Sequence, residues 1–74
     1  MKVVYYVKID RKDSGVDLSF PNFPSLGKVF CPGGIDDALL TARATLREFA
    51  KKESFLPNPI PYYGEEFYPV HIDV

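Results

Sequence analysis

His71 and Cys31 are the two side chains in the sequence best suited to acid–base or nucleophilic chemistry. A histidine acts as a general base or metal ligand when a neighbouring group orients its ring, and no neighbour of His71 in the sequence identifies such a group. Cys31 is the only cysteine, so it has no second thiol for a disulfide or a metal site, and no histidine lies near it in sequence. We predict that His71 points to solvent or to a partner and that Cys31 is a half-buried, unreactive residue.

Gly33 and Gly34 precede a helical segment, which is a position at which some proteins bind phosphate. A phosphate-binding loop also needs a lysine and a serine or threonine, and the sequence around these glycines has none. Asp36 and Asp37 follow directly and would repel an anion. The two glycines therefore indicate a turn rather than a phosphate site.

Aromatic side chains gather in the last quarter of the sequence, around Gly64-Glu65-Glu66. A small domain cannot bury eleven aromatic residues, so these either lock the last strand onto the sheet or anchor a partner. Stacking on single-stranded nucleic acid would need basic neighbours, whereas the neighbours here are glutamates. The pattern favours protein or self-association, and the predicted partner-contacting residues are Phe23, Tyr62, Tyr63, Glu65, Glu66, Phe67 and Tyr68.

Composition limits the classes of function. The chain has 74 residues and 46% apolar residues, which suits one globular domain over residues 1–74 and excludes a disordered segment. Nine Lys and Arg residues against ten Asp and Glu residues give a net charge of −1, so we expect no direct contact with nucleic acid. The N-terminal apolar run is too short for a membrane span or a signal peptide. We therefore expect a cytoplasmic protein, and its small size predicts a homo-oligomer or a complex with another protein.

Alternating apolar residues predict a strand from Lys2 to Asp10. After the polar turn residues 12–15, the pattern of Val16, Leu18 and Phe20 predicts a second strand that forms an antiparallel hairpin with the first. The prolines in residues 20–24 predict a rigid, aromatic-bearing loop. A short third strand is expected at residues 28–31.

One helix is predicted at residues 35–52, where apolar residues recur at spacings of three and four. Three alternate prolines in residues 55–61 predict an extended, polyproline-like connector. Residues 67–74 then predict a last strand, with Val70, Ile72 and Val74 on one face. The expected fold is α+β: an antiparallel sheet in the order β-β-β-α-β, with one helix packed on one face.

Several sequence segments, in this order along the chain, resemble one protein family, and together they extend over nearly the whole chain. The segments are the first strand (Tyr5-Tyr6-Val7-Lys8-Ile9-Asp10), Ser19-Phe20-Pro21-Asn22-Phe23-Pro24 after Gly15, the helix start (Ile35-Asp36-Asp37-Ala38-Leu39), and Leu56-Pro57-Asn58-Pro59-Ile60-Pro61. The second is similar to an S-F-P-D-L-P-G signature and the third to L-E-E-A-L. Together they resemble the N-terminal domain of HicB-type antitoxins, which are partners of HicA-type RNA-cleaving toxins.

The chain also departs from that family. Ser25 stands where the family usually has glycine, residues 26–34 form a slightly longer stretch, and the helix lacks the common Ser or Thr cap. Many HicB proteins continue into a DNA-binding segment, whereas this sequence ends at Val74, so operator binding is not expected to carry over. The resemblance implies a partial ribonuclease-H-like fold that binds protein, with a HicA-like toxin as partner.

A ribonuclease-H-like fold also raises a metal-dependent nuclease as an alternative. Such enzymes gather carboxylates around two Mg²⁺ ions, and Asp10, Glu48 and Asp73 lie on elements of the required types. Asp10 has the opposite parity to the apolar face of its strand, and Glu48 lies among basic residues, so solvated surface carboxylates explain them better. We therefore expect no enzyme activity, no cofactor and no metal. The remaining alternative is a solitary HicB-like oligomeric binding protein with an unrelated role.

Overall fold

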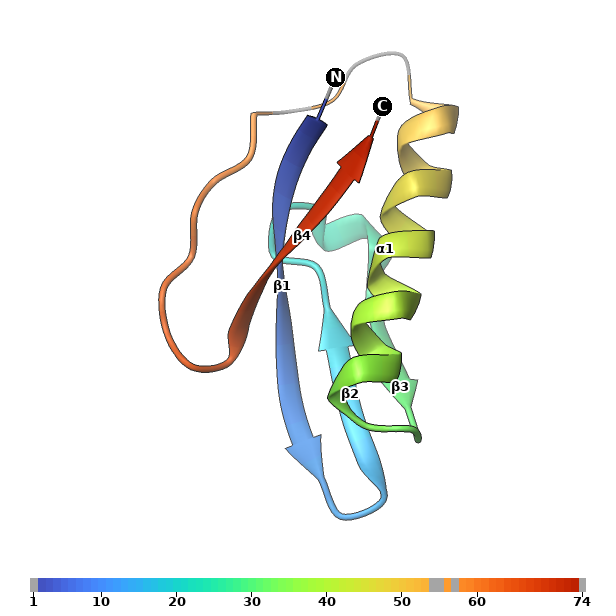
Figure 1. Ribbon diagram of the computed structural model, residues 1–74, viewed down its shortest axis with the longest axis vertical. Coiled ribbons are helices and arrows are strands. Elements are labelled where there is room, and N and C mark those ends of the chain that lie inside the picture. Colours follow the sequence, from blue (N-terminus) through green and yellow to red (C-terminus); the bar gives the residue numbers. More distant parts are fainter. Residues whose placement is uncertain (1, 54–55, 57, 74) are drawn as a thin grey trace.

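Four strands form one antiparallel sheet, and a single helix packs against one of its faces (Figure 1). The computed structural model describes residues 2–53, 56 and 58–73. In chain order the elements are β1 (Lys2–Lys12), β2 (Gly15–Ser19), the 3-10 turn η1 (Pro24–Leu26), β3 (Lys28–Cys31), α1 (Ile35–Lys52) and β4 (Phe67–Asp73). The strand order across the sheet is β3-β2-β1-β4. The predicted α+β class and the β-β-β-α-β order are confirmed.

Strand β1 is long because it pairs with two different strands along its length. Its first part pairs with β4, from Lys2 opposite Asp73 to Lys8 opposite Phe67. Its second part pairs with β2, from Lys8 opposite Ser19 to Lys12 opposite Gly15. The two ladders therefore meet at Lys8, and among the described residues each half of β1 has one edge on which no sheet strand lies opposite. These two edges carry the features described below.

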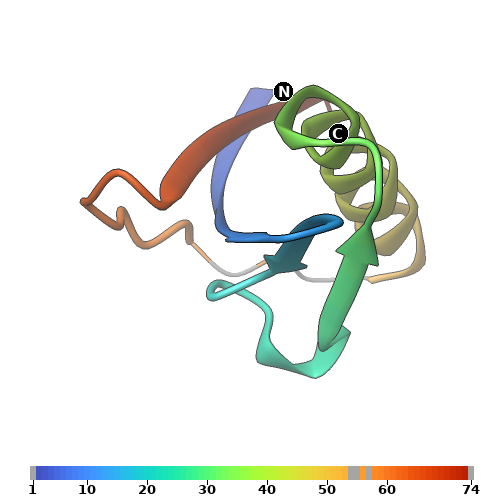
Figure 2. The same cartoon turned by 90° about the horizontal axis from the view of Figure 1, so that it is seen from below.

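The hydrophobic core lies between the sheet and α1. Alternate residues of β1, β2 and β4 point toward the helix, which contributes Ala38, Ala42 and Leu46. Small alanines let the helix approach the sheet closely, and Figure 2 shows α1 on one side of the curved sheet. The buried apolar set comprises Tyr5, Val7, Ile9, Val16, Leu18, Phe20, Phe23, Cys31, Ala38, Ala42, Leu46, Val70 and Ile72. The alternate residues of the strands and the helix residues spaced by three or four thus pack together into one core.

Helix α1 begins and ends at the residues that the sequence predicts. Its N-cap is Gly34, whose φ of 96° lies in the left-handed region that glycine adopts without steric strain. This backbone requirement explains why a glycine stands where a Ser or Asp would be the usual cap. Asp36 and Asp37 occupy the first turn and Lys51 and Lys52 the last, so charge complements the helix dipole at both ends.

Three details differ from the predictions. β1 extends to Lys12 instead of Asp10, because Lys12 and Gly15 close the hairpin ladder and leave only two residues in the turn. The loop after β2 contains the short η1, and Phe20 and Phe23 point into the core from it. Cys31 is buried, at 5% exposure, rather than half-buried. Of the connector and last strand, residues 54, 55, 57 and 74 lie outside the described part of the chain, and residues 58–61 belong to neither helix nor strand.

Tyr5 makes the stability of the fold sensitive to high pH. Its side chain is 1% exposed, and burial raises the pKa of its hydroxyl above the ordinary value of 10.0. Above pH 10 the unfolded chain loses this proton while the folded protein keeps it, so the Tyr5 contribution to stability is complete below pH 10 and is lost as pH rises through the folded pKa. Urea denaturation between pH 8 and 11 should show a steeper fall for the parent protein than for Tyr5→Phe. Parallel falls would contradict this prediction.

Candidate protein-binding surface

The segment from Tyr62 to Tyr68 leads into β4 and carries six of the seven predicted contact residues. Before it, residues 58–61 of the connector run along the side of β1 and β4 that lies away from α1 (Figure 1). Gly64 has a φ of 134°, and the Phe67 N–H donates to the Gly64 carbonyl over 3.3 Å. This closes a four-residue turn with Glu65 and Glu66 at its corner. We call residues 64–67 the acidic turn.

The acidic turn is fastened to the sheet through Phe67, which begins β4, and through a backbone hydrogen bond to β1. The Ile9 N–H donates to the Glu66 carbonyl over 2.8 Å, one step beyond the last β1–β4 pair. Both glutamate side chains are exposed. No salt bridge joins either carboxylate to another residue in the described part of the chain. The turn therefore holds two negative charges at a fixed place on the surface.

Beside the acidic turn lies a surface hollow of about 530 Å³, which we call the β1 hollow. Its floor includes Ile9, Ile35 and Tyr68, which are buried or half-buried. Its rim is charged. The lining residues are Ile9, Asp10, Arg11, Ile35, Glu65, Glu66 and Tyr68. The structure thus brings three of the predicted contact residues, Glu65, Glu66 and Tyr68, to one hollow with the second part of β1.

The aromatic residues of this segment divide between the two roles that the sequence leaves open. Tyr62 stacks on Phe67 with ring centroids 5.1 Å apart, and Tyr68 packs against the core, so these rings help to hold β4 in place. Tyr63, in contrast, is 84% exposed. An exposed aromatic ring beside an acidic turn is typical of a protein-contacting surface.

Phe23 does not join this surface. It is 6% exposed and packs edge-on against Tyr5 and at a tilt against Phe49, with ring centroids 4.7 and 4.8 Å apart. The proline-rich loop therefore directs its aromatic rings inward. The structure assigns Phe23 to the core between β1 and α1.

Of the three carboxylates considered for a nuclease, Asp10 and Asp73 lie far apart. Asp73 pairs with Lys2 at one end of β1, and Asp10 lies eight residues along that strand, or roughly 25 Å away at ordinary strand spacing. Glu48 is on α1, with its carboxylate 3.4 Å from the Lys51 ammonium. Among the described residues, no group of three or more His, Cys, Asp or Glu side chains could hold a metal ion. His71 is exposed on β4, as predicted.

Asn22 is a structural residue of the surface that the sequence analysis did not identify. Its side-chain oxygen accepts the Tyr6 N–H over 2.8 Å, and its amide nitrogen donates to the Ile60 carbonyl over 3.1 Å. The first contact replaces the strand neighbour that β1 lacks after β2 ends at Ser19. The second holds the connector that leads to Tyr62. No local pattern marks Asn22, because its partners lie 16 and 38 residues away.

Replacing Asn22 with alanine is expected to lower the free energy of unfolding by about 1–2 kcal/mol, because a half-buried N–H loses its acceptor. Asn22→Asp keeps that acceptor and loses only the donor to Ile60, so its effect should be smaller. Urea denaturation of both variants, with the exposed Asn58→Ala as control, checks this order. An Asn22→Ala effect no larger than that of Asn58→Ala would contradict it.

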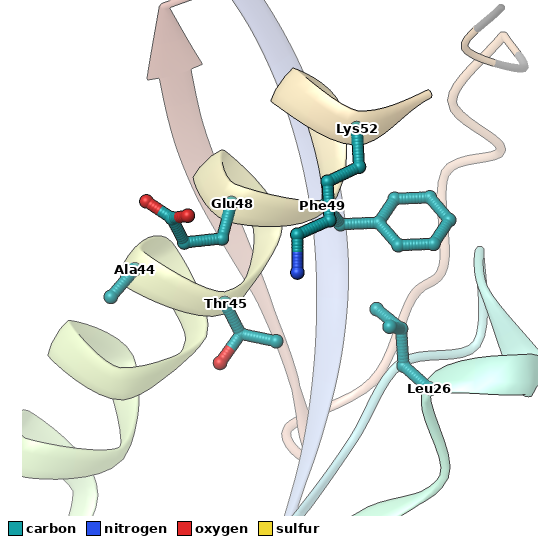
Figure 3. A pocket seen from close by; sticks show the side chains of 6 residues that line it. All are labelled: Leu26, Ala44, Thr45, Glu48, Phe49 and Lys52. Carbon is teal, nitrogen blue, oxygen red and sulfur yellow. The ribbon is translucent and has the colours of Figure 1, made fainter. Parts of the chain in front are cut away.

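A second hollow, of about 420 Å³, lies between α1 and η1. Figure 3 shows Leu26 of η1 and Phe49 of α1 beside it, with Glu48 and Lys52 also lining it. Leu26 and Phe49 both pack against the core. The apolar residues of this hollow therefore have a structural role, which is to pack η1 against the helix.

Comparison of the chain with protein-family models, with curated proteins and with solved structures finds no match. Within the described residues, no helix combines the length and apolar character needed to cross a membrane. The assignment of function therefore depends on the surface itself and on the resemblance carried by the sequence.

Proposed function

We propose that this chain is a HicB-like protein-binding domain that masks a HicA-type RNA-cleaving toxin in the cytoplasm. The observation that carries the proposal is the acidic turn, which holds two exposed carboxylates next to the exposed Tyr63 and the β1 hollow. An RNA-cleaving protein has a basic surface for its substrate, and an acidic surface of this kind complements it. The action is steric and requires no reactive group.

The proposal is tested by co-expressing the chain with any small basic protein encoded beside it. We expect the two proteins to copurify and the chain to relieve the growth arrest that the basic protein causes alone. An inactive variant of the basic protein, which no longer cleaves RNA, should still bind. Failure to form any complex would remove the antitoxin assignment and favour a solitary HicB-like binding protein.

We also propose that the domain associates with itself. Its small core and two exposed apolar side chains on different elements, Phe30 at 48% and Leu40 at 64%, favour a form in which further apolar area is covered. Light scattering coupled to size-exclusion chromatography should give a molar mass above 8.4 kDa at high concentration. A monomer throughout would contradict self-association without affecting the toxin-binding proposal.

A further inference from the structure

The second part of β1 has an edge on which β4 does not continue. β4 begins at Phe67, opposite Lys8, and the chain turns away at the acidic turn. The Ile9 N–H points to this edge, since it donates to the Glu66 carbonyl. In an antiparallel strand the N–H and C=O of one residue share an edge and the next residue uses the other, so the N–H and C=O of Arg11 point the same way as those of Ile9.

The backbone of Arg11 therefore faces the β1 hollow. Asp10 and Lys12 use the opposite edge, in their pairs with Asp17 and Gly15. No strand of the described chain lies opposite Arg11 on the hollow side. The appearance of three consecutive β1 residues, 9 to 11, in the lining of the hollow agrees with a strand edge that forms one of its walls.

We propose that this edge receives an extended segment of the toxin partner, which adds a strand to the sheet in line with β4. The inference rests on the proposed function and specifies how the partner is held. Because the Ile9 N–H is already bonded to the Glu66 carbonyl, the N–H and C=O of Arg11 would supply the backbone hydrogen bonds, as in other complexes formed by strand addition. The segment needs an extended backbone, an apolar residue for the floor and a lysine or arginine for the rim.

The chemistry of the hollow selects this occupant. Glu65 and Glu66 bound the place where the added strand would meet the acidic turn, and Asp36 and Asp37 are exposed just after Ile35 of the floor. These carboxylates complement a basic segment and disfavour an acidic one. The exposed Arg11 side chain has a long flexible stem, which lets its charge remain in water when the backbone is paired.

Amide hydrogen exchange of residues 9–12, followed by NMR, tests the inference with the inactive toxin variant as the probe. In the free protein the Arg11 amide should exchange rapidly, whereas the Asp10 amide, paired with β2, should be protected. Binding of the probe should slow exchange at Arg11 by about 100-fold and leave Asp10 nearly unchanged.

A pair of variants supplies the matched comparison. Arg11→Pro removes the N–H that faces the hollow and leaves the pairing residues of β2 in place, whereas Arg11→Ala keeps the N–H and removes the side chain with its charge. Arg11→Pro should weaken probe binding at least about tenfold more than Arg11→Ala. The exchange measurement on the parent protein decides the question if Arg11→Pro does not fold.

The outcomes separate the inference from the proposed function. A complex in which the Arg11 amide still exchanges rapidly would overturn the inference and leave toxin binding intact. Protection of Arg11 in the free protein that grows with its own concentration would assign the edge to a second copy and would also overturn it. The absence of any complex would overturn both.

Discussion

Replacing Phe23 with alanine is expected to lower the free energy of unfolding by about 3–5 kcal/mol. Phe23 is 6% exposed and its ring joins Tyr5 of β1 to Phe49 of α1, so its removal leaves a cavity between the sheet and the helix. Small domains have a total stability of about 5–15 kcal/mol, often at the low end. The loss is therefore a large part of the whole, and urea denaturation followed by circular dichroism should show it directly.

Tyr63→Ala is the matched control for Phe23→Ala. Both variants delete an aromatic ring, but Tyr63 is 84% exposed, so its removal should change stability by no more than about 0.5 kcal/mol. If Phe23→Ala does not fold at all, Phe23→Leu should still fold, with a smaller loss of about 1–2 kcal/mol. Equal effects of Phe23→Ala and Tyr63→Ala would show that Phe23 does not hold the core together.

Reversing the charge of the acidic turn, with Glu65→Lys and Glu66→Lys together, is expected to weaken toxin binding by about 100-fold, or about 2.8 kcal/mol. The two carboxylates are exposed and have no salt-bridge partner in the described chain, so the variant should fold with nearly unchanged stability. Two lysines at the corner of the turn would face a basic partner with like charge. Titration calorimetry with the inactive toxin variant measures the change.

A second charge reversal, Glu48→Lys with Glu53→Lys, controls for net charge. Both glutamates are exposed, and both lie at the far end of α1, away from the β1 hollow. The variant has the same net charge as the acidic-turn variant, so any difference in binding reports position rather than total charge. Raising the salt concentration should also weaken parent binding, since exposed charges are screened. Equal loss of binding in both variants would exclude the acidic turn as the contact surface.

The helix and strands of this protein are predictable because the spacing of apolar residues within each segment indicates its secondary structure. The alternation in β1 and β4 and the three-to-four spacing in α1 locate those elements almost to the residue. The charges and Gly34 mark the start of the helix, and Lys51 and Lys52 mark its end. Phe23 shows the limit of such patterns. A phenylalanine between prolines looks like a surface anchor, and only its contacts with Tyr5 and Phe49 place it inside.

The sequence by itself determines the α+β class, the hairpin and the aromatic, acidic character of the segment before β4, because short-range periodicity and side-chain chemistry are local properties. The tertiary structure decides where the pairing of β1 with β2 and with β4 stops. This in turn decides that the Tyr6 N–H is left for Asn22 and that the backbone of Arg11 faces the β1 hollow. Those features depend on the register between strands separated by more than fifty residues. Register is fixed by packing of the whole sheet on α1, which no single segment encodes.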